Sequence, residues 1–69
     1  MTPPWDKHPE LGRGRMGWRM GYGEEYLNSF WQWFSRLSND EKGAYEVRFP
    51  EAEGWRGFYE RIRAHPWLK

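Results

Sequence analysis

The chain has 69 residues, room for one small domain, and no cysteine, which excludes a disulfide framework and a thiolate metal site. Its formal net charge of +1 lacks the strong positive excess of a dedicated nucleic-acid-binding protein. An N-terminal stretch without an apolar region, and the lack of any apolar run of about 18 residues, predict a soluble, cytoplasmic protein.

The apolar content is mostly aromatic. Six Trp, four Tyr and four Phe contrast with only six Leu, Ile and Val residues in total. So few aliphatic residues would by themselves suggest disorder. However, the net charge is low, and each buried aromatic ring removes about 150–250 Å² from water. We therefore expect a folded domain with an aromatic core.

The first 23 residues predict an extended arm rich in Gly, Arg and aromatic residues. From 15 to 22, large side chains alternate with Arg or Gly, which is the period of an extended, half-buried segment. One side of this segment carries Met16, Trp18, Met20 and Tyr22. We expect that side to lie across the helices, with the arginines projecting from the other side.

Within the arm, Gly12 to Gly17 match the nucleotide-binding pattern G-x-G-x-x-G. That pattern binds a dinucleotide only between a strand and a helix of a βαβ unit. No apolar strand precedes these glycines, and the next predicted helix begins several residues later. We therefore attribute the match to glycine content and expect no nucleotide cofactor.

Residues 24–37 predict the central helix. At about 100° per residue, its large apolar side chains share an arc of roughly 160°. These side chains are Tyr26, Leu27, Phe30, Trp31, Trp33, Phe34 and Leu37. Glu24 and Glu25 fall in the first turn, where negative charge is favourable, and an arc this wide can contact two neighbours.

Residues 39–48 predict a second helix. Ser38-Asn39-Asp40-Glu41 has the spacing of a capping box, and Pro50 limits the helix at its other end. The apolar stripe is thin, because it consists of little more than Ala44 and Tyr45 with the stem of Arg48.

Residues 54–64 predict a third helix. Trp55, Phe58, Tyr59 and Ile62 lie on one face within roughly 100°. The chain therefore predicts an all-α fold: a three-helix domain over 24–69, whose central helix packs against Trp55, Phe58 and Ile62 and is overlaid by Met16, Trp18 and Met20 of the arm.

Few residues are candidates for a nucleophile or for a histidine metal ligand. The Ser and Thr hydroxyls are Thr2 and three serines, of which Ser38 is explained by capping and the other two lie on the polar face of helix 24–37. His8 and His65 both precede proline, and turn chemistry explains them better than a metal site does. We expect no enzyme, no metal and no cofactor.

The number of large aromatics and arginines is high for so small an interior, and Trp, Tyr and Arg dominate interface energetics. We therefore expect a non-enzymatic protein–protein interaction module or accessory subunit, with some of Trp5, Trp18, Trp33 and Trp67 partly exposed. The candidate partner-binding residues are Arg13, Arg15, Trp18, Arg19, Trp33, Arg56, Arg63 and Trp67.

Two alternatives remain open from the sequence. One is a nucleic-acid-binding accessory protein that uses the arginines of the arm and of the third helix on phosphates. Those arginines are Arg13, Arg15, Arg19, Arg56, Arg61 and Arg63. The other is homodimerisation through the extended arm, whose unpaired edge could pair with its symmetry mate.

Overall fold

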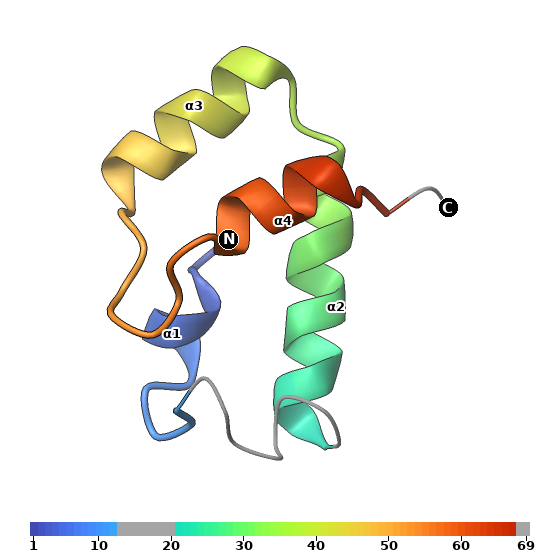
Figure 1. The fold of residues 1–69 in the computed structure, drawn as a ribbon. Coiled ribbons are helices and arrows are strands. Elements are labelled where there is room, and N and C mark those ends of the chain that lie inside the picture. The colour runs from blue at the N-terminus through green and yellow to red at the C-terminus, as the bar shows by residue number, and fades with distance from the viewer. Residues whose placement is uncertain (13–20, 68–69) are drawn as a thin grey trace.

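A computed structural model describes residues 1–12 and 21–67. These residues form four helices and no strand, which confirms the all-α fold (Figure 1). The helices are α1 (Pro4–Lys7), α2 (Tyr22–Ser35), α3 (Asn39–Arg48) and α4 (Phe58–Ala64). Helix α4 crosses α2 near the C-terminal end of α2, and α1 lies beside the loop that leads into α4.

Helix α2 is the central helix and is displaced by two residues toward the N-terminus from the predicted range 24–37. It begins after Gly21, whose φ of 97° is a backbone conformation that glycine adopts most easily. It ends at Ser35 because the amides of Arg36 and Leu37 bond to carbonyls three residues back, which tightens the last turn. Phe30 and Phe34 of this helix are completely buried.

Helix α3 has the predicted bounds. The Ser38 hydroxyl accepts a hydrogen bond from the Glu41 amide at 3.1 Å, and the Glu41 carboxylate accepts one from the Ser38 amide at 2.9 Å. The capping box is therefore confirmed, and the helix ends before Phe49-Pro50.

Helix α4 is shorter than the predicted range 54–64. Gly54 and Gly57 have φ values of 88° and 85°, so the chain makes turns there before the helix begins at Phe58. Trp55, Phe58 and Ile62 are all buried, as their spacing predicts, but Trp55 lies in a turn before the helix. The prediction of a helical start at 54 is wrong for this reason.

The N-terminal segment is not extended along its whole length. Pro4–Lys7 form one helical turn, with a proline at a position where its missing N–H costs nothing. The Trp5 ring lies 5.4 Å from the Trp55 ring and 5.9 Å from Phe58, measured between centroids. Residues 13–20, with the predicted overlay by Met16, Trp18 and Met20, are outside the described residues.

The core confirms the predicted packing of Trp55, Phe58 and Ile62 against the aromatic face of the central helix. Its buried hydrophobic side chains are Phe30, Phe34, Trp55, Phe58, Tyr59 and Ile62. The rings meet in stacked and edge-to-face geometries, for example Phe34 with Tyr59 at 5.3 Å. Such pairs are favoured by the ring quadrupoles in addition to the area they bury.

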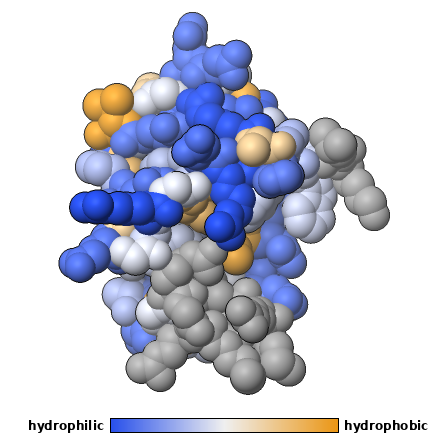
Figure 2. Space-filling model, viewed as in Figure 1, coloured by the Kyte–Doolittle hydropathy of each residue, from blue (hydrophilic) through white to orange (hydrophobic). Residues whose placement is uncertain are grey.

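One face of the molecule is mainly polar (Figure 2). Figure 2 shows hydrophilic residues over most of one face, with hydrophobic residues in small separate spots. Among the described residues, no helix combines the length and the apolar character needed to cross a membrane.

Replacing Phe34 by Ala should lower the free energy of unfolding by about 3–5 kcal/mol, because it leaves a cavity among stacked rings. Urea unfolding followed by circular dichroism would measure the loss. Val47→Ala is the control: this residue is 83% exposed, so its substitution should change stability by less than about 0.5 kcal/mol. If Phe34→Ala does not fold at all, Phe34→Leu should still show an intermediate loss. Equal unfolding midpoints for wild type and Phe34→Leu would contradict this account of the core.

Candidate functional site

An open groove of about 450 Å³ lies where the end of α2, the inner face of α3 and the N-terminus meet. We call it the α3 groove. Its lining residues are Met1, Trp33, Leu37, Glu41, Ala44, Tyr45, Arg48 and Phe49. Most of these side chains are apolar or aromatic, and a carboxylate and a guanidinium accompany them.

The helical repeat of α3 explains how it contributes to the groove. Glu41, Ala44, Tyr45 and Arg48 have the spacing i, i+3, i+4 and i+7, which places them on one face of a helix. No residue of α3 is fully buried. The helix therefore covers the core only partly, and its inner face stays open beside Trp33.

Tyr45 attaches α3 to the rest of the molecule. Its ring lies 5.2 Å from Trp33, 5.9 Å from Phe34 and 4.8 Å from Phe49, measured between centroids. Its hydroxyl donates a hydrogen bond of 2.7 Å to the carbonyl of Met1. Burial, with smaller contributions from the charges of Tyr26 and Asp6, raises the pKa of Tyr45 well above its ordinary value, so the hydroxyl stays a neutral donor at neutral pH.

The two charged residues of the groove lie seven positions apart on α3. The hydrogen bond from the Ser38 amide is the main cause that lowers the pKa of Glu41, so this carboxylate is ionised at neutral pH. The Arg48 guanidinium lies 5.4 Å from the centroid of the Phe49 ring, within the range of a cation–π contact. In the part of the chain that the structure describes, no carboxylate pairs with Arg48.

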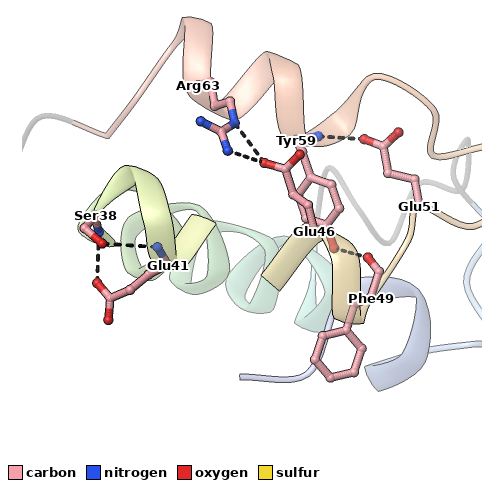
Figure 3. Close-up of polar contacts among 7 residues, drawn as sticks. All are labelled: Ser38, Glu41, Glu46, Phe49, Glu51, Tyr59 and Arg63. Atoms are coloured by element: carbon pink, nitrogen blue, oxygen red, sulfur yellow. Dashed lines mark hydrogen bonds and ion pairs between the residues drawn. The ribbon is translucent and has the colours of Figure 1, made fainter. Parts of the chain in front are cut away.

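A set of polar contacts holds the loop after α3 against α4 (Figure 3). The Glu51 carboxylate accepts hydrogen bonds from the amides of Gly57 at 2.9 Å and Tyr59 at 2.8 Å. The Tyr59 hydroxyl donates to the carbonyl of Phe49 at 2.7 Å. The Phe49 backbone, and with it one edge of the groove, is thereby held in place by the core.

The predicted partner-binding residues do not gather at one place. Trp33 lines the α3 groove, and Arg56 lines a separate hollow of about 260 Å³ together with Arg61. Arg63 forms an ion pair with Glu46 at 2.6 Å. Trp67 is half-buried near the end of α2, where its amide donates to the Ser35 hydroxyl. The other predicted residues, Arg13, Arg15, Trp18 and Arg19, are outside the described residues.

Sequence reasoning missed most of the groove. Tyr45 and Arg48 stood in the thin stripe of the second helix, but nothing in the spacing indicated that Phe49 and Met1 would join them. The thinness of that stripe is the feature of the sequence that indicates an open surface. A helix with few apolar residues to bury leaves part of its inner face uncovered.

The histidines have structural contacts. His8 lies 3.5 Å from the Glu10 carboxylate, and its ring meets Tyr22 and Tyr26 edge-on at 4.7 and 5.6 Å. The carbonyl of His65 accepts a hydrogen bond from the indole of Trp31 at 2.7 Å. Within residues 1–12 and 21–67, no group of three or more metal-ligating side chains is found.

Comparisons of the chain with protein-family models, with curated proteins and with solved structures gave no match. A functional assignment therefore depends on the geometry of the groove and on the chemistry of its residues.

Replacing Glu51 by Ala should lower the free energy of unfolding by about 1–2 kcal/mol, because two amides at the start of α4 lose their acceptor. The matched control is Glu53→Ala. The Glu53 side chain is exposed and lies two residues away, and its replacement makes the same change of charge. Urea unfolding curves of the two variants check this. Equal losses in both would show that net charge, and not the cap, causes the effect.

The depressed pKa of Glu41 predicts a pH dependence of stability. A carboxyl whose pKa is lower in the folded than in the unfolded state stabilises the fold above its ordinary pKa of 4.5, and this contribution is lost as the pH falls through the folded-state pKa. Glu41→Gln keeps an acceptor for the Ser38 amide but cannot titrate there. Unfolding curves measured from about pH 7 to pH 3 should show a smaller acid-induced loss in the variant.

Glu10, whose pKa is also lowered, is present in both proteins, so the difference between the two curves reports Glu41 alone. Identical acid dependence in wild type and Glu41→Gln would contradict a titrating cap.

Proposed function

We propose that the protein is a non-enzymatic protein-interaction module or accessory subunit of the cytoplasm, and that it receives its partner in the α3 groove. The observation that carries the proposal is the lining of this groove. Trp33, Leu37, Tyr45 and Phe49 remain half-buried there, although a core of other side chains is already complete. Aromatic residues and Arg beside an uncovered apolar face are typical of binding surfaces.

The exposure of the tryptophans supports the proposal. Of the five in the described ranges, Trp55 is buried, whereas Trp5, Trp31, Trp33 and Trp67 each keep part of their surface in contact with solvent. A large ring that is held in place on one side and open on the other loses little conformational freedom when a partner covers it. This is the property that makes Trp frequent among residues that dominate binding.

Two of the three serines support a role other than catalysis. The Ser38 hydroxyl caps α3, and the Ser35 hydroxyl donates to the carbonyl of Trp31 while it accepts from the amide of Trp67. A nucleophilic serine would require a neighbouring base, and these two hydroxyls have structural partners instead.

Nucleic-acid binding is the second candidate. Arg56 and Arg61 line one hollow, and in the described part of the chain neither pairs with a carboxylate. Phosphate is a ligand that two neighbouring guanidinium groups can bind. Arg63, by contrast, is already paired with Glu46, so α4 presents fewer unpaired cations than its sequence indicates.

A pull-down with the tagged full chain, from a lysate of the organism that makes it, tests the two candidates. We expect a stoichiometric protein partner that remains after nuclease treatment and at raised salt, because contacts with apolar groups are barely screened. The double variant Arg56→Gln/Arg61→Gln should retain the same partner. Loss of every partner on nuclease treatment, with nucleic acid in the eluate and steep dependence on salt, would favour the second candidate.

A further inference from the structure

We infer that the occupant of the α3 groove is a short amphipathic helix of a protein partner, antiparallel to α3, with an acidic residue near its start that pairs with Arg48 and a bulky apolar residue that packs on Trp33. This inference rests on the proposed function and specifies its partner. Three features of the groove support this occupant: its length, the helices and loop that surround it, and the placement of its charges.

The dimensions suit about two turns of helix. Glu41 and Arg48 are seven residues apart, and at 1.5 Å per residue they are separated by about 10 Å along α3. Between them lie Ala44 and the Tyr45 ring, with Trp33 opposite. An apolar floor of this length, closed by a charge at each end, accommodates a helix face with anchors at i and i+3 or i+4.

The groove favours a helix over an added β-strand. A peptide that binds as an added β-strand gains its affinity from main-chain hydrogen bonds to a sheet edge. The described residues around the groove belong to helices and to a loop, and they present no strand edge. A helix satisfies its own main-chain groups and needs only side-chain contacts from the groove.

The charges set the direction of the partner helix. Glu41 lies in the first turn of α3 and Arg48 in its last turn. Helices are stabilised by acidic residues in the first turn and by basic residues in the last turn. An antiparallel partner places its first turn beside Arg48 and its last turn beside Glu41, so its preferred end charges complement both residues.

Arg48 is available for this contact, whereas Arg63 is not. The guanidinium of Arg63 lies 2.6 Å from a Glu46 oxygen, but no carboxylate in the described residues approaches Arg48, which lies over the Phe49 ring. A guanidinium that an aromatic face holds in position is well placed to bind a carboxylate in a two-pronged contact.

The test is a selection of displayed peptides of about 14 residues, biased toward helix, against the immobilised full chain. We expect enriched peptides to share an acidic residue about one turn before a large apolar residue. Selection against Arg48→Glu should replace that acid by Lys or Arg. A peptide selected on the wild type should bind Arg48→Glu at least about tenfold more weakly, because like charges then meet.

Arg61→Glu is the matched control, since it makes the same change of charge in the other hollow. It should bind the selected peptide within about twofold of wild type. Trp33→Ala, checked for folding by circular dichroism, should lose binding together with Arg48→Glu.

Equal affinity of the selected peptide for wild type and Arg48→Glu would overturn the inference, and so would an enrichment with no acidic preference. If the pull-down yields a nuclease-resistant protein that Trp33→Ala and Arg48→Glu still retain, the groove is not the binding site. The protein is then still an interaction module, but the inference about the groove fails. If the pull-down yields only nucleic acid, the proposed function itself fails. A concentration-dependent dimer that Arg48→Glu abolishes would identify a second copy as the occupant and would also overturn the inference.

Discussion

The fold depends on aromatic side chains whose rings lie in or against the core and whose hydroxyl or indole N–H groups donate hydrogen bonds to backbone carbonyls. The hydroxyls of Tyr26, Tyr45 and Tyr59 bind the carbonyls of Thr2, Met1 and Phe49, and the indole of Trp31 binds that of His65. A chain with six Leu, Ile and Val residues has few other ways to form a core, and buried phenol and indole groups need partners. The same residues therefore supply apolar area and attach the irregular segments to the helices.

This arrangement also produces the groove. Tyr45 holds Met1 on one side, and Tyr59 holds the backbone of Phe49 on the other, so both edges are attached to the core although neither lies in a helix. The Glu51 carboxylate binds two amides at the start of α4 and thereby fixes the loop that connects α3 to α4. A surface whose floor and edges are held in this way is preorganised, which reduces the ordering cost of binding.

Helix α3 is unusual in that it contributes no fully buried residue. Its capping box supports it locally, the Glu46–Arg63 ion pair connects it to α4, and the Tyr45 ring is its main contact with the core. The ion pair is partly exposed and contributes modestly, so the packing of Tyr45 is the stronger term. Because the Tyr45 ring is the main contact of α3 with the core, the rest of its inner face remains open.

Local signals in the sequence determined α3 and the character of α2. Ser38, Glu41 and Pro50 specify a start and a stop through contacts within a few residues, and the apolar arc of the central helix identifies Phe30 and Phe34 as core. Tertiary structure decided what local signals could not. The start of α4 depends on the positive φ of Gly57, and the turn of α1 accompanies the packing of Trp5 on Trp55. The groove joins Met1, Trp33 and Phe49, which no local pattern relates, because their proximity arises only when the aromatic core brings distant segments together.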